Sequence, residues 1–146
     1  YSFASHFAPR MLDQAIKLYR ENFEPPEYLA QPYASMGVPT VVAQTDEEAE
    51  YLATSAYQRV LGLMRGQSLK LKAPVETMEG IWSPAEKMSV DNFYAMGQIG
   101  SPETVKAGLE ELLEKYNVDE FIFTCDIYDT DKRIQNFELL MDIKNS

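Results

Sequence analysis

The sequence has very few of the residues on which metal centres and disulfide frameworks depend. It contains one cysteine and one histidine among 146 residues. A single cysteine excludes an internal disulfide and a cysteine-rich metal site, and it is typical of proteins in a reducing cytosol. We therefore expect a cytoplasmic protein with no bound metal.

Basic residues and long apolar runs are also scarce. The chain carries 13 basic and 23 acidic residues, which gives a net charge of −10. A nucleic-acid-binding surface needs a basic patch, and a membrane-spanning helix needs about 20 predominantly apolar residues in a row. Neither feature is present in the sequence. We expect no nucleic acid and no membrane as partners.

The signatures of several enzyme classes are missing as well. The chain has no GxSxG, HExxH or GxGxxG motif and no Walker A loop. A Ser-His-Asp triad would have to use His6, and nothing in the sequence pairs this histidine with a nucleophile. The residues alone give no support to a hydrolase or a P-loop enzyme.

The spacing of apolar residues predicts short strands that alternate with helices. The expected strands are 2–4, 38–43, 96–100 and 119–125, and the expected helices are 11–23, 45–64, 83–96, 101–117 and 129–141. The residues expected to cap helices are Thr45, Ser83, Ser101 and either Asp129 or Thr130. Thr45 and Ser83 are each followed three residues later by a glutamate, which predicts a capping box. This order is typical of parallel βαβ units in an α/β protein.

Residues 66–82 show no regular period and contain Gly66, Pro74 and Gly80. We expect a long loop here, of the kind that is often functional or mobile, with Trp82 anchoring it to the body of the protein. Because no stronger boundary exists, residues 1–146 are expected to form a single unit in which this loop is an insertion.

The number of strands points to half of a barrel. A TIM-type (β/α)8 barrel has eight strand–helix units and typically about 250 residues, whereas this chain offers four strands. The chain also begins with Tyr1 rather than methionine. Both features favour a truncated chain that forms part of a larger barrel.

Polar residues follow several of the predicted strands, where ligands of parallel α/β proteins gather. His6 follows the first strand, either as a group that contacts a ligand or as a packing residue. Residues 44–46 and 100–103 suit helix capping, with a phosphate site at 100–103 as the alternative.

The last predicted strand ends in an acidic stretch. Asp126, Asp129 and Asp131 lack the spacing of a calcium loop and fit a cap and a solvated turn, although magnesium held with a phosphate stays open. Cys125 has no basic neighbour in sequence that would lower its pKa, so we expect a buried rather than a reactive thiol.

Several stretches, taken in order, resemble the luciferase-like monooxygenase family. They are YSFASHFAP, YRENFEP, AQTDEEAEYLATS, WSPAEK, IGSPETVKAGLEELLEKYNVDEFIF and IYDTDKRIQNFELL. The resemblance is greatest to the bacterial flavin-dependent subgroup called luciferase family oxidoreductase, group 1, and it covers nearly the whole chain. It implies the C-terminal half of a (β/α)8 barrel, with YSFASHF as strand five, VPTVVA as strand six, 97–99 as strand seven and EFIFT as strand eight.

The family resemblance also implies a cofactor and partners. The intact protein would be a flavin-dependent monooxygenase that uses reduced FMN and oxygen on a small-molecule substrate, with the flavin reduced by a flavin reductase or a nicotinamide cofactor. Ser5 and His6 would lie on the side of strand five that faces the flavin. The segment before YSFASHF, which contributes to the family's phosphate site, is absent, so the chain alone is expected to bind flavin weakly and to be inactive.

A second hypothesis needs no catalysis. Half of a barrel exposes sheet edges and apolar strand faces, which invite pairing with another copy. The chain would then be an α/β interaction or dimerisation module. A homodimer is expected under either hypothesis.

Overall fold

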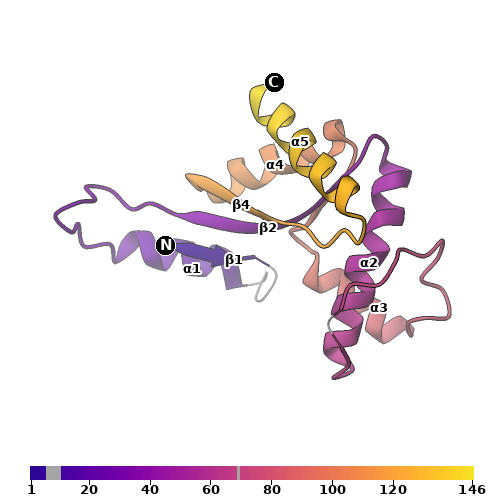
Figure 1. Cartoon of the computed structure of the whole chain (residues 1–146). Coiled ribbons are helices and arrows are strands. Elements are labelled where there is room, and N and C mark those ends of the chain that lie inside the picture. The colour runs from indigo at the N-terminus through magenta and orange to yellow at the C-terminus, as the bar shows by residue number, and fades with distance from the viewer. Residues whose placement is uncertain (6–10, 69) are drawn as a thin grey trace.

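Strands and helices alternate along the chain in the order that the apolar pattern predicts. The computed structural model describes residues 1–5, 11–68 and 70–146. Its elements are β1 (Ser2–Ala4), α1 (Leu12–Glu21), β2 (Ser35–Val42), α2 (Asp46–Met64), α3 (Pro84–Phe93), β3 (Gln98–Gly100), α4 (Pro102–Tyr116), β4 (Glu120–Thr124) and α5 (Thr130–Asn145). Figure 1 shows β2 running through the middle of the molecule, with β1 and α1 beside its beginning and α2 beyond its end.

The strand β2 is the partner of the three other strands, and every pairing is parallel. β1 pairs with its first three residues, Ser35 to Gly37, and β4 pairs with residues 35–39. These two strands therefore flank β2 on opposite edges. β3 pairs with the last three residues of β2. The strand also begins three residues earlier than the sequence predicts, because both β1 and β4 supply partners to its start.

The parallel strands and intervening helices match part of a (β/α)8 barrel, with one difference in strand neighbours. In a barrel of consecutive strands β4 would pair with β3, whereas here it pairs with β2. β3 has only three residues, and it pairs beyond the segment of β2 that β4 uses. The first half of β2 is consequently open to β4.

Beyond the end of β4, a side chain instead of a strand accepts a hydrogen bond from the backbone of β2. β4 pairs with β2 no further than Pro39. The backbone N–H of Val42 donates instead to Oδ1 of Asn136 on α5, 2.7 Å away. Asn136 is fully buried, so this bond satisfies a backbone group that has no access to water.

Most of the predicted caps form. Thr45 accepts from the N–H of Glu48 and Ser83 accepts from that of Glu86, and only the second pair completes its capping box. Glu48 instead accepts from the N–H of Gln44 and binds Lys132, which draws its carboxylate away from the Thr45 N–H. Asp129, rather than Thr130, caps α5.

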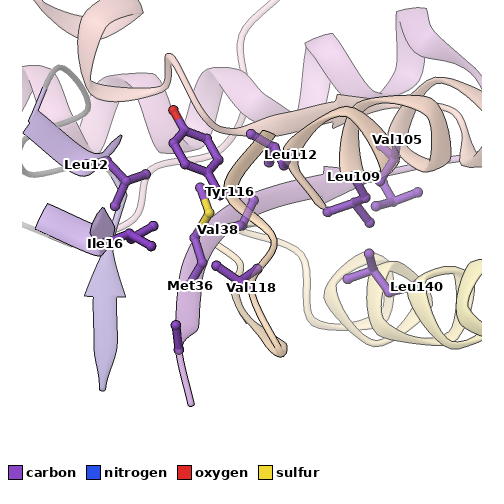
Figure 2. Packing of buried hydrophobic residues seen from close by; sticks show 12 residues of the cluster. Leu12, Ile16, Met36, Val38, Val105, Leu109, Leu112, Tyr116, Val118 and Leu140 are labelled. Carbon is purple, nitrogen blue, oxygen red and sulfur yellow. The ribbon is translucent and has the colours of Figure 1, made fainter. Parts of the chain in front are cut away.

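The larger core cluster lies against one face of β2. It combines α1, β2, α4, α5 and the turn before β4, and Figure 2 shows Leu12, Ile16, Met36, Val38, Val105, Leu109, Leu112, Tyr116, Val118 and Leu140. A second cluster packs Val41 of β2, and Ala43 just after this strand, against α2 and Ile127. Both faces of β2 are thus covered by apolar side chains, as its sequence predicts.

Within the part of the chain that is described, no helix is long and apolar enough to cross a membrane.

Candidate functional site at the carboxyl ends of the strands

Ser5, one of the two residues predicted to contact the cofactor, binds the protein itself. It follows β1 and is completely buried. Its hydroxyl donates to the carbonyl of Gly37 at 2.6 Å, and its backbone N–H donates to the same carbonyl at 3.3 Å. His6 lies outside the described residues. The contact of either residue with a cofactor therefore stays a prediction.

The strands end at different levels along β2. β1 ends opposite Gly37, whereas β3 ends opposite Val42. Five residues of strand correspond to a distance of roughly 16 Å. Ser5 therefore does not meet the polar groups at the end of β3.

The carboxyl ends of β2 and β3 do meet. Oδ1 of Asp46, at the start of α2, accepts a hydrogen bond of 2.6 Å from the backbone N–H of Ser101. This bond, with hydrogen bonds to the side chains of Thr104 and Ser101, lowers the pKa of Asp46. The Ser101 hydroxyl caps α4 by accepting from the N–H of Thr104. Of the two alternatives for residues 100–103, the structure favours capping, because a carboxylate of the chain already occupies an amide that a phosphate would use.

A second polar junction joins α2 to α5. Lys132 forms an ion pair with Glu48, and the hydrogen bond from the ammonium group lowers the pKa of this glutamate. Asp129 accepts from the backbone N–H of Lys132. Asp129 therefore caps α5, and the described residues contain no group of three metal-ligating side chains.

A third polar group lies just after β4. Nε of Arg59 on α2 donates to Oδ2 of Asp126 at 2.8 Å, and the two side chains form an ion pair. Burial raises the pKa of the Tyr94 hydroxyl, and the charge of Asp126 raises it further. Burial likewise raises the pKa of the Cys125 thiol. This thiol is only partly buried, and no lowered pKa activates it.

Sequence reasoning did not single out Arg59 or Tyr94. Arg59 and Asp126 are 67 residues apart, and no motif links them. The one local signal is an arginine one position before Val60, a core residue of α2. A charged group beside a buried position needs a partner, and this requirement could have drawn attention to it.

A cleft lies between α2, residues 76–82 and α3. It has a volume of about 500 Å³. Trp82 contacts the ring of Tyr57 at 5.9 Å between centroids, which agrees with its expected role as the anchor of the long loop. The loop is held further by Thr54, whose hydroxyl accepts from the N–H of Val75.

The described residues do not by themselves fit FMN. The cavity beside Thr40, Thr124 and Asp126 has a volume of about 10 Å³, which is room for about one water molecule. The cleft on α2 is large enough for a ring, but the carboxylates that line it, such as Glu47 and Glu50, would repel a phosphate. An FMN site would therefore need residues other than these.

A basic cleft between α1 and α4 does not change this result. Its Arg20 donates to the carbonyls of Tyr116 and Asn117, and its Lys17 pairs with Glu21. These groups surround the carboxyl end of α4, which leads into the start of β4. The cleft thus lies near the opposite ends of the strands from those at which ligands of parallel α/β proteins bind.

Comparison with known proteins agrees with the resemblance seen in the sequence. No family model matches the chain. The chain is 41% identical to the uncharacterized protein YvbT of Bacillus subtilis, over 98% of this chain and 43% of that protein. It is 39% identical to a protein named luciferase-like monooxygenase from Escherichia coli, over 99% of this chain and 43% of that protein.

Solved structures show the same fold. The crystal structure of apo-MsnO8 matches 99% of this chain and 44% of its own with a TM-score of 0.77 at 18% identity. That of the monooxygenase RslO1 from Streptomyces bottropensis matches 97% of this chain and 39% of its own with a TM-score of 0.64 at 14% identity. Along nearly its whole length the chain is thus similar to a protein named luciferase-like monooxygenase, and it spans less than half the length of the curated proteins that it matches.

Proposed function

We propose that this chain is the C-terminal half of a flavin-dependent monooxygenase-like oxidoreductase that uses reduced FMN and oxygen on a small-molecule substrate. The observation that carries the proposal is the 39% identity with the Escherichia coli luciferase-like monooxygenase over 99% of the chain. The fold shared with MsnO8 and RslO1 supports it. A flavin reductase or a nicotinamide cofactor would supply the electrons, and the single cysteine suits a cytoplasmic location.

Within this proposal, Ser5 and His6 end strand five beside the flavin. Ser5 would act by holding β1 against β2 through its bond to Gly37. His6 would be a polar neighbour of the cofactor or substrate. Because the described residues do not fit FMN, we assign no chemical step to them.

The 146-residue chain should therefore bind FMN weakly or not at all. The test is a titration of FMN followed by the quenching of flavin fluorescence. It is run on this chain and on the product encoded by its reading frame at native length. We expect stoichiometric binding, and oxygen consumption with reduced FMN, only for the native-length product. Tight stoichiometric binding by the 146-residue chain would refute the prediction that this chain holds only part of the FMN site. An inactive native-length product would refute the proposed function.

The alternative, a non-enzymatic interaction module, rests on the exposure of β4. Its Ile122 is 44% exposed, and among the described residues this strand pairs only with β2. A second copy of the chain could cover this strand and form a homodimer. Sedimentation equilibrium at high protein concentration tests the homodimer, and a monomer throughout would exclude it. A dimeric native product that binds no flavin would favour the module.

A further inference from the structure

The cleft between α2, residues 76–82 and α3 combines aromatic walls with carboxylates. Its volume of about 500 Å³ is within the range of small-molecule sites. Tyr57 and Trp82, whose rings are in contact, line the cleft together with Met78, which is almost fully buried. Aromatic faces next to negative charge are the surroundings that organic cations prefer in proteins.

The chain already holds one ammonium group in this way. Nζ of Lys87 lies 5.7 Å from the centroid of the Trp82 ring and 2.7 Å from Oδ2 of Asp91. The contact places a primary amine between an aromatic face and a carboxylate. The cleft therefore accommodates at least one ammonium group, which here is that of Lys87, one of its lining residues.

Three further carboxylates of the cleft have no cationic partner among the described residues. They belong to Glu47 and Glu50 on α2 and to Glu76 on the long loop. Among the described residues, the carboxylate of Glu50 accepts a hydrogen bond only from the hydroxyl of Tyr57, at 3.3 Å. The cleft thus has four carboxylates and one lysine, so its charge is strongly negative.

The spacing of these carboxylates argues against a metal ion. No three metal-ligating side chains of the described residues lie close enough together to hold one. Glu47 and Glu50 are three residues apart along α2, and Glu76 comes from a different segment. Carboxylates that come from two separate segments and do not cluster match a ligand with several positive groups along an apolar chain better than they match a single small ion.

We propose that this cleft binds a linear aliphatic polyamine. Its ammonium groups would bind Glu50 and Glu76, and its methylene segments would lie against Tyr57 and Trp82. Its occupation does not depend on the function proposed above.

Trp82 makes the test specific to the cleft, because it is the only tryptophan in the chain. Spermidine is titrated into the 146-residue chain while tryptophan emission is recorded. We expect a saturable change in emission. The uncharged diol 1,8-octanediol, used at the same concentrations, is expected to give none. Binding elsewhere on an acidic protein would leave the emission unaltered.

Charge-neutral variants separate the cleft from the net charge of the protein. The double variant Glu50→Gln/Glu76→Gln should bind spermidine roughly tenfold more weakly, because two charge-assisted contacts are lost. The double variant Glu110→Gln/Glu114→Gln removes two exposed charges from α4 and should bind as the parent does. Equal weakening by both would show general attraction to an acidic surface and overturn the proposal.

Removal of the internal ammonium group should have the opposite effect. Lys87→Gln frees Asp91 and the face of Trp82, and should strengthen spermidine binding several-fold. Lys17→Gln breaks the comparable pair with Glu21 on α1 and should leave binding unaltered. Circular dichroism verifies that each variant is folded. No saturable emission change in a folded parent chain, or an equal gain in both lysine variants, would overturn the proposal.

Discussion

The carboxylate of Asp46 accepts a hydrogen bond of 2.6 Å from the backbone N–H of Ser101, 55 residues away. The bond joins the helix that follows β2 to the end of β3. It also leaves no room beside Gly100. A Cβ at that position would lie 2.7 Å from Cγ2 of Thr104 and 2.8 Å from Oδ1 of Asp46. The close packing of this junction therefore requires glycine.

We expect Gly100→Ala to destabilise the protein. The added methyl group must displace Thr104 or Asp46, and overpacking of this kind costs about 1–3 kcal/mol of the free energy of unfolding. Urea denaturation measures the change. Gly37→Ala is the matched control, because its new Cβ would be 3.6 Å from the Phe3 carbonyl oxygen, an ordinary contact. Equal losses in the two variants would contradict the prediction.

Asn136→Leu should be destabilising although leucine is similar in size and apolar. The change removes the acceptor of the Val42 N–H, which is then buried without a partner. Such a loss costs about 1–3 kcal/mol. The exposed Asn145→Leu on the same helix should leave the free energy of unfolding nearly unaltered. If Asn136→Leu were as stable as the parent in urea, the bond would have no structural importance.

The ion pair of Glu86 should make stability depend on pH. Hydrogen bonds from Arg65 and then from the Ser83 N–H lower the pKa of Glu86 from 4.5 to about 2. Because the folded state holds the carboxylate more strongly than the unfolded state does, this group stabilises the fold above pH 4.5. The stabilisation is lost as the pH falls from 4.5 towards 2.

Glu86→Gln tests this dependence. The variant should unfold at lower urea concentration than the parent at neutral pH, and the difference should shrink steadily below pH 4.5. Glu110→Gln, on an exposed face of α4, provides the control for a general effect of charge. A difference between parent and Glu86→Gln that stays constant down to pH 2 would refute the assignment.

Cys125 should react slowly with thiol reagents. Burial raises the pKa of its thiol, so little thiolate is present at neutral pH. As the only cysteine, it gives a single reaction with Ellman's reagent. We expect a much lower rate in the folded chain than in urea at the same pH. Equal rates would mean that the thiol is already accessible.

The local features of the fold could be predicted from the sequence, and the pairings between distant segments could not. Ser83 with Glu86 and Ser101 before a proline mark helix starts, because a cap depends on residues three positions apart. The pairing of β4 with β2 depends instead on how much of β2 the short β3 leaves unpaired. No local pattern carries that information.

The candidate site shows the same limit. Ser5 could be placed at a strand end from sequence, but its bond to Gly37 requires the register of β1 and β2. Arg59 and Asp126 meet only because α2 passes the end of β4. The cleft is formed by three segments of the chain. The only part of it that the sequence predicted is the role of Trp82 as the anchor of the long loop. Sites that depend on contacts between such distant residues can be identified only from the folded structure.

The strand β2 also gains its partners at very different times during protein synthesis. β1 precedes it, whereas the β4 residues that pair with it follow 85 positions later. Asn136 follows Val42 by 94 positions. Pairings over such separations form slowly, because the loss of chain entropy precedes the gain in contacts. Until β4 and α5 have been synthesised, one edge of β2 therefore stays unpaired, and this apolar strand is a segment that would need shielding from aggregation.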